Sequence, residues 1–231
     1  MNVDLRDRLA EIEAEHASLK AELRAFEADY MRHVGVIMAQ VHDLEARILT
    51  RTAERTGAAA DREAARAAGE RAERTYAQMR AVPMAGGPLP TGDLKQLFRE
   101  AAKRMHPDLV RDADGRVHAE AFMKRLNEAY RAVDAERIRD LLLQWNASPY
   151  APPVAAAGEL RGLEAAVARA EQRLAQERAS EMARIMEQAM ASAAEGRDLL
   201  AEMRSAAQTQ LTGCRARWEA LSSEAAQDSA T

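Results

Sequence analysis

The sequence predicts an all-α protein in which two long coiled-coil helices flank a small helical hairpin. Only 4% of its 231 residues are aromatic, while 47% are hydrophobic and 30% are charged. The apolar content therefore comes mainly from Ala, Leu, Val and Met, which favours helices with apolar stripes over a β-rich fold or one large core. All seven prolines lie between positions 83 and 153. Because proline breaks helix interiors, only the two flanks can hold long uninterrupted helices.

Residues 1–82 are expected to form the first long coiled-coil helix. Apolar residues recur there at spacings of three and four, which is the a/d pattern of a heptad repeat. The stripe shifts by one position beside Gly35 and then continues, which indicates a stutter that unwinds the supercoil without ending the helix. The stripe consists of Leu5, Leu9, Ile12, His16, Leu19, Leu23, Phe26, Tyr30 and His33, and then Val34, Ile37, Val41, Leu44 and Ile48.

The middle of the chain is expected to hold a compact helical hairpin between two linkers. Proline and glycine crowd into residues 83–93, which we interpret as the first linker. The hairpin and a short third helix occupy residues 94–148, and residues 149–155 form the second linker. We expect Asp93 to cap the first helix, with Gln96 at the spacing of a capping box.

Apolar stripes at helical spacing predict the helices of this central segment. The first runs from 94 to about 105, and Pro107 ends it, because a proline disfavours helix at the preceding residue. We expect His106-Pro107-Asp108 to be an exposed loop, and Asp134 to cap the third helix. The residues expected in the core are Phe98, Phe122, Leu126, Tyr130 and Trp145. The basic residues expected on the outer face of the first helix are Lys95, Arg99, Lys103 and Arg104.

The central segment resembles the J domain of the DnaJ (Hsp40) family of Hsp70 co-chaperones. The resemblance rests on a basic helix L-x-x-x-F-R-x-x-A-x-x-M, on His106-Pro107-Asp108, and on F-x-x-x-L-N-E-A-Y from Phe122 to Tyr130. It covers about residues 94–145. The family's first helix has no close counterpart. Its nearest candidate is the segment from Tyr76 to Val82, which would pack beside the hairpin; the alternative is that the C-terminal flank docks on the hairpin. The family's Gly/Phe-rich segment and Cys-x-x-Cys repeats are absent.

The resemblance implies a co-chaperone that binds a DnaK-type Hsp70 and stimulates its ATP hydrolysis through the HPD loop, residues 106–108. The residues that it implicates in Hsp70 binding are Lys95, Arg99, Lys103, Arg104, His106, Pro107 and Asp108. The chain itself is not expected to be an enzyme, because the sequence places no nucleophile, metal set or phosphate loop near His106 and Asp108. No catalytic residue, metal site or cofactor is therefore predicted.

The last flank, residues 156–223, is expected to form a second coiled-coil helix with a weaker, Ala- and Met-rich seam, and residues 224–231 a frayed tail. A helix with one apolar stripe is not stable alone, so each flank needs a partner. We expect a homodimer formed through the first flank. The rival arrangement is a monomer in which the first flank folds back antiparallel against residues 156–221.

Charge and cysteine content restrict the partners and the cellular compartment that we expect for this protein. The formal net charge is −4, and acidic residues interleave with the arginines of residues 51–75, so nucleic-acid binding is not expected. No stretch approaches the ~20 apolar residues that span a bilayer, so no membrane partner is expected. The single cysteine, Cys214, fits a cytoplasmic protein and is interpreted as a small apolar residue of a helical seam. The alternative function is a coiled-coil scaffold or assembly protein with a degenerate J-like hairpin.

Overall fold

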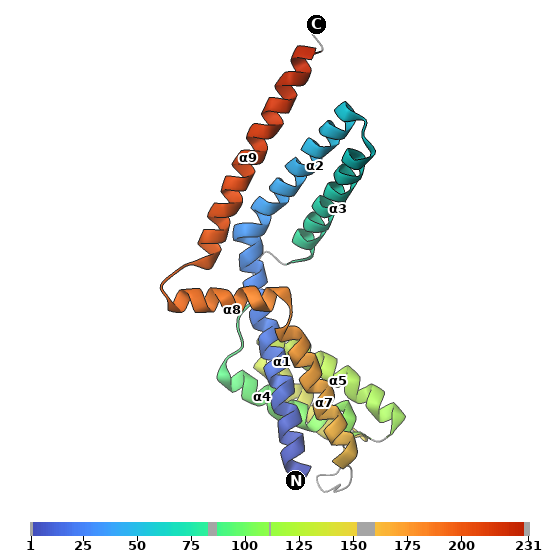
Figure 1. Ribbon diagram of the computed structural model, residues 1–231. Helices are drawn as coiled ribbons and strands as arrows, with labels where there is room; N and C mark the ends of the chain where they lie inside the picture. Colours follow the sequence, from blue (N-terminus) through green and yellow to red (C-terminus); the bar gives the residue numbers. More distant parts are fainter. Residues whose placement is uncertain (1, 83–86, 111, 152–159, 229–231) are drawn as a thin grey trace. The chain divides into compact units, whose positions relative to one another are not determined.

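The computed structural model describes residues 2–82, 87–110, 112–151 and 160–228. All regular structure in these ranges is helical, so the predicted all-α class is confirmed (Figure 1). Among the helices described, none combines the length and the apolar character needed to span a membrane. The chain divides into two compact units, one of Met1–Ala25 with Gly87–Ile185 and one of Phe26–Gly86 with Met186–Thr231.

The first unit combines the start of the chain with the central hairpin and a helix from the last flank. Thr91 caps α4 (Gly92–Met105) by accepting a hydrogen bond from the Leu94 amide, so the prediction of Asp93 as the cap is wrong. Asp93 lies instead in the first turn, where its charge complements the helix dipole. The first unit consists of α1 (Asn2–Tyr30), which begins in this unit, α4 (Gly92–Met105), η2 (Pro107–Leu109), α5 (Ala113–Arg131), α6 (Ala135–Asn146) and α7 (Leu160–Arg178).

Helix α1 closes the core of the hairpin. The predicted core side chains are all buried, and Phe98 packs against Tyr130 with ring centroids 4.7 Å apart. Opposite them α1 presents a face of small residues that is buried in the same cluster, made of Ala10, Ala14 and Ala17. The hydroxyl groups of Ser18 and Tyr130 lie 2.7 Å apart and join the two sides. Small side chains on this face allow α1 to approach the hairpin closely.

The segment from Tyr76 to Val82, the nearest candidate for the family's first helix, belongs to the second unit. Tyr76 lies in α3 (Ala59–Ala81), which belongs to the second unit, and its side chain is exposed. Within the first unit, alanines of α1 cover the hairpin core instead.

The first flank is not one continuous helix over residues 1–82. A π-helical turn, η1 (Met31–Gly35), joins α1 to α2 (Val36–Thr56). A π turn takes one extra residue, which explains the shift of the apolar stripe by one position beside Gly35. Gly57 then adopts φ 63° and ends α2, and α3 folds back on α2 with Ala68 and Ala72 buried. The imidazole of His42 bonds Thr75 across this hairpin, 2.8 Å away.

The last flank is also divided, into α7, α8 (Glu181–Ala194) and α9 (Leu199–Asp228). Gly196 has φ 77° in the break before α9, and α9 continues past the predicted end at residue 223. Of the predicted linkers and tail, residues 83–86, 152–155 and 229–231 lie outside the described residues.

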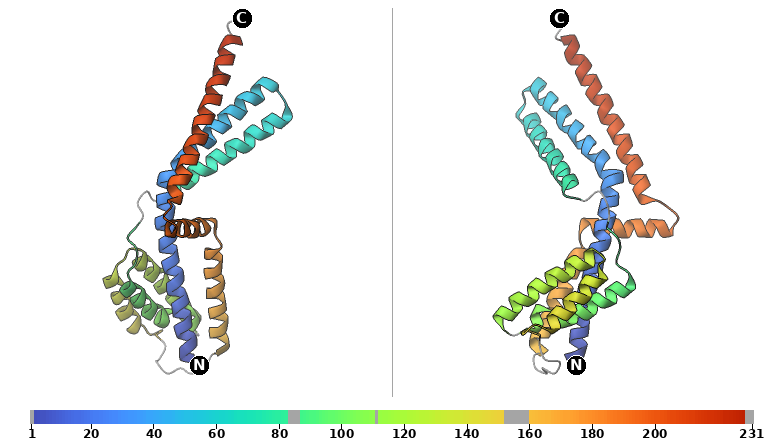
Figure 2. Two further views of the ribbon diagram at one scale, coloured as in Figure 1. Left: turned by 60° about the vertical axis from the view of Figure 1, so that its left-hand side comes forward. Right: turned by 180° about the vertical axis from the view of Figure 1, so that it is seen from behind.

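Each flank finds a partner within the same chain, and the paired helices run parallel, whereas the rival monomeric arrangement had them antiparallel. In the first unit α1 runs parallel to α7, and in the second α2 runs parallel to α9 (Figures 1 and 2). The first pair buries Leu9, Ile12, Leu163, Ala166, Val167, Ala170 and Leu174, and the second buries Val41, Ile48, Leu211 and Cys214. The seam role predicted for Cys214 is confirmed, and burial raises the pKa of its thiol. These buried seam residues need no second chain to cover them.

Candidate functional site

The HPD loop is held in shape by its own residues. Helix α4 ends at Met105, and His106 has the extended backbone conformation that a following proline favours. Residues Pro107–Leu109 then form a single 3₁₀ turn. The Nδ1 atom of His106 accepts a hydrogen bond from the backbone N–H of Asp108 at 3.2 Å. The tripeptide is therefore a fixed local structure.

The prediction that this loop is exposed is wrong for His106. Its relative exposure is 5%, and it is the one buried polar or charged residue among those that the structure describes. Glu13 of α1 faces this side chain, with a carboxylate oxygen 3.5 Å from Nε2 of His106. Pro107 and Asp108 are half-buried.

Glu13 links the loop to α7. Its side chain is largely buried, and Arg173 of α7 donates a hydrogen bond to the same oxygen that faces His106. Burial acts to raise the pKa of Glu13, but the hydrogen bond with His106 and the charge of Arg173 outweigh burial and lower it. Glu13 is therefore ionised at neutral pH and accepts from both neighbours.

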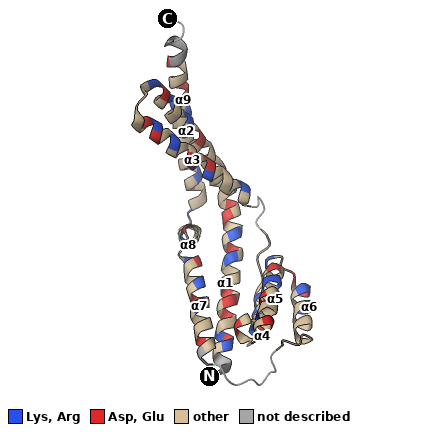
Figure 3. Ribbon diagram, turned by 90° about the vertical axis from the view of Figure 1, so that its right-hand side faces the viewer, with Lys and Arg blue, Asp and Glu red and all other residues tan. Residues whose placement is uncertain are grey.

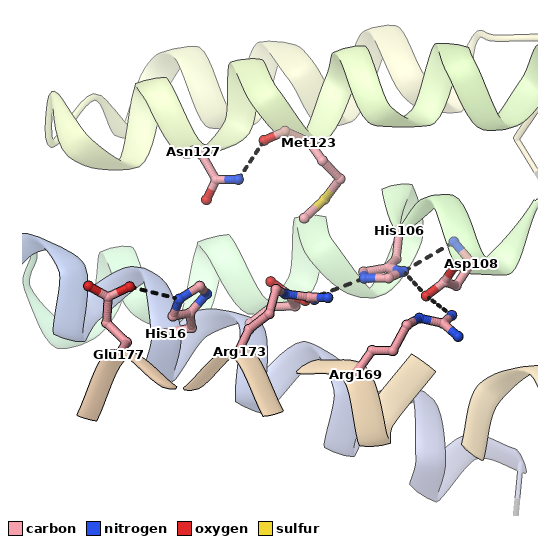
Figure 4. Close-up of polar contacts among 9 residues, drawn as sticks. His16, His106, Asp108, Met123, Asn127, Arg169, Arg173 and Glu177 are labelled. Atoms are coloured by element: carbon pink, nitrogen blue, oxygen red, sulfur yellow. Dashed lines mark hydrogen bonds and ion pairs between the residues drawn. The ribbon is translucent and has the colours of Figure 1, made fainter. Parts of the chain in front are cut away.

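Asp108 is also engaged by α7. Its Oδ2 atom accepts a hydrogen bond from Arg169 at 2.9 Å and lies 3.8 Å from Nδ1 of His106. Figure 4 shows Arg169 and Arg173 extending from α7 toward the loop side of the site. The acidic group expected to act on a partner is thus paired with an arginine of the same chain.

The predicted basic face is largely paired within the first unit. Charged residues of both signs are distributed along α1 and α7 (Figure 3). Arg99 bonds Glu11 of α1 at 2.5 Å, which raises the pKa of Arg99, and Lys103 pairs with Asp7 of α1. Arg104 pairs with Glu100 on its own helix. Lys95 forms no ion pair with any residue of the described ranges.

A second group of polar contacts joins α1 to α7. His16 lies 3.5 Å from Glu177 of α7, and Lys20 lies 3.7 Å from the same carboxylate. Burial and the charge of Lys20 lower the pKa of His16, even though Glu177 acts in the opposite direction. Asn127 of the N-E-A-Y segment donates to the backbone carbonyl of Met123 at 2.9 Å, within its own helix.

The structure thus brings the HPD loop together with three residues that the sequence analysis did not identify, Glu13, Arg169 and Arg173. On a sequence they resemble the charged outer positions of any amphipathic helix. Only the parallel docking of α1 and α7 brings them to the loop.

Within the described ranges, no group of three or more His, Cys, Asp or Glu side chains is arranged to hold a metal ion. In comparisons with known proteins, no family model, no curated protein and no solved structure matches this chain.

Proposed function

We propose that this protein is a J-domain co-chaperone that binds a DnaK-type Hsp70 in the cytoplasm and stimulates its ATP hydrolysis through the HPD loop. The observation that carries the proposal is the placement of His106-Pro107-Asp108. The tripeptide lies at the end of a basic helix and in front of a second helix, and the two helices pack through Phe98 and Tyr130.

The chemistry of Asp108 supports this function. A carboxylate that accepts a guanidinium N–H forms a short, charge-assisted hydrogen bond, and Asp108 does so with Arg169 in this structure. The same carboxylate can accept a hydrogen bond from an arginine of Hsp70. His106 fixes the backbone N–H of Asp108 and so limits the directions in which the carboxylate can point.

The basic residues beside the loop would guide the encounter with Hsp70. Arg99, Lys103 and Arg104 are only partly covered by their ion pairs, and Lys95 is half-buried. Charges on one helix face raise the association rate with an acidic partner and fix its register more than they raise affinity. Stimulation should therefore weaken as the salt concentration rises.

The test is single-turnover ATP hydrolysis by a DnaK-type Hsp70 from the same source, with and without this protein. Asp108→Asn should abolish stimulation, because it removes the charge that accepts an arginine. Asp114→Asn is the matched control, since Asp114 is an exposed residue in the first turn of α5 and undergoes the same chemical change. Equal rates with and without the wild-type protein, on an Hsp70 that another J protein activates, would refute the proposal.

A coiled-coil scaffold is the second candidate function, and the internal pairing of the HPD loop favours it. A purely structural loop would also use His106 to end α4 and Asp108 to pair with a neighbouring helix. Direct binding measurements with purified Hsp70 separate the two candidates. A scaffold would bind Hsp70 no better than the Asp108→Asn variant does.

A further inference from the structure

The contacts of α7 indicate what kind of ligand the HPD loop accepts. Arg169 and Arg173 are four residues apart, so they project from successive turns of one helix face. They reach two carboxylates from different elements, Asp108 of the loop and Glu13 of α1 (Figure 4). One helix thus donates hydrogen bonds to two acidic acceptors.

Apolar packing sets the register of α7 on this site. Leu163, Val167 and Leu174 are buried against Leu9 and Ile12 of α1. Leu109, which directly follows the HPD loop, packs against the same cluster. The loop therefore meets α7 through both a polar and an apolar contact.

α1 and α7 differ in how they are attached to the hairpin. α1 contributes Ala10, Ala14 and Ala17 to the hairpin core and cannot leave without opening it. Among the described residues, that core includes none from α7. A movement of α7, or of the Arg169 side chain alone, uncovers Asp108 and leaves the hairpin core closed.

We infer that the HPD loop and Glu13 form an acceptor site for a helix bearing arginines at positions i and i+4, and that α7 fills this site in cis. The part of this inference that concerns Hsp70 rests on the proposed function. In it, Hsp70 competes with Arg169 for Asp108, and the apparent affinity for Hsp70 equals the intrinsic affinity multiplied by the fraction of molecules in which Asp108 is free.

The size of the effect follows from the exposure of the pair. The side chains of Arg169 and Asp108 are 53% and 32% exposed, so solvent screens their attraction. Ion pairs of this kind shift an equilibrium by about 1.5- to fivefold. Arg169→Ala should tighten Hsp70 binding by that factor and lower the concentration needed for half-maximal ATPase stimulation.

Arg178→Ala is the matched control for the binding experiment. Arg178 also lies on α7 and pairs with a glutamate of α1, Glu15, but it does not contact the loop. Its Hsp70 affinity should equal that of the wild type. If Arg169→Ala and Arg178→Ala both bind like the wild type, competition by α7 is refuted while the co-chaperone function stands.

A second measurement tests the contact without Hsp70. Urea unfolding of the wild type, Arg169→Ala, Asp108→Asn and the double variant forms a double-mutant cycle. Coupling of about 1.5- to fivefold in the unfolding equilibrium constant supports occupation of the site by α7. Absence of coupling overturns it. Coupling together with no ATPase stimulation by any variant would reject the proposed function and leave the occupied acceptor site in place.

Discussion

Ala14 offers the sharpest test of how the hairpin core is closed. Its side chain is 0% exposed and lies in the same cluster as Phe98 and Tyr130. Ala14→Leu adds three carbon atoms where the packing leaves no solvent-accessible space. Overpacking of this kind costs about 1–3 kcal/mol of unfolding free energy. At an exposed helical position the same change is close to neutral, because Ala and Leu are both strong helix formers.

The two tryptophans make the measurement specific to one unit. Trp145 is buried in the hairpin core, and Trp218 lies in the second unit. In a Trp218→Phe background, fluorescence therefore reports on the first unit alone. With a urea m-value of about 2 kcal/mol/M, Ala14→Leu should lower the unfolding midpoint by roughly 0.5–1.5 M.

Ala165→Leu is the matched control, because Ala165 is an exposed residue of α7 in the same unit. Its midpoint should stay at that of the background protein. If Ala14→Leu and Ala165→Leu unfold at the same urea concentration, α1 does not close the hairpin core in solution.

Three further predictions use the same fluorescence assay. Gly115→Ala should cost about 1–2 kcal/mol, since its Cβ would lie 2.6 Å from a methyl group of Val110, and an unchanged midpoint would contradict that packing. His106→Gln should cost about 1–3 kcal/mol, because it disturbs a buried group that contacts Glu13, whereas a fully exposed loop would show no loss. The pKa of His16 is lowered by burial and a neighbouring lysine, so the unfolded chain binds its proton more readily. Stability should therefore fall as the pH drops below about 6.5, and His16→Gln should reduce that slope; an identical slope would exclude His16 as its source.

The hairpin could be predicted from the sequence because its signals are local. Apolar residues at helical spacing placed Phe98, Phe122 and Trp145 in the core, and all three are buried. Asp134 caps α6 as predicted, by accepting a bond from the amide of Arg137 at 2.9 Å. The periodicity of apolar residues, the helix caps and the proline that ends a helix each depend on residues only a few positions apart. They can therefore be recognised in a single sequence.

The surroundings of the loop could not be predicted because they depend on docking. Glu13 and Arg173 are 160 residues apart, and nothing in either helix distinguishes them from solvated charges. The sequence pointed to the segment around Tyr76, and not to α1, as the helix beside the hairpin for a related reason. An aromatic residue gives a strong signal in a sequence, whereas Ala10 and Ala14 pack by being small and give almost none.

The closure of the hairpin by α1 has a consequence for the protein during its synthesis. α1 is made before the central segment, and Trp145 is added to the chain long after Ala17. At about 5–20 residues per second, translation takes roughly 6–25 s to cover that interval. For this time the alanine face of α1 and the leucines beside it have no partner from the hairpin. The nascent chain thus exposes this apolar surface before the residues that cover it have been made.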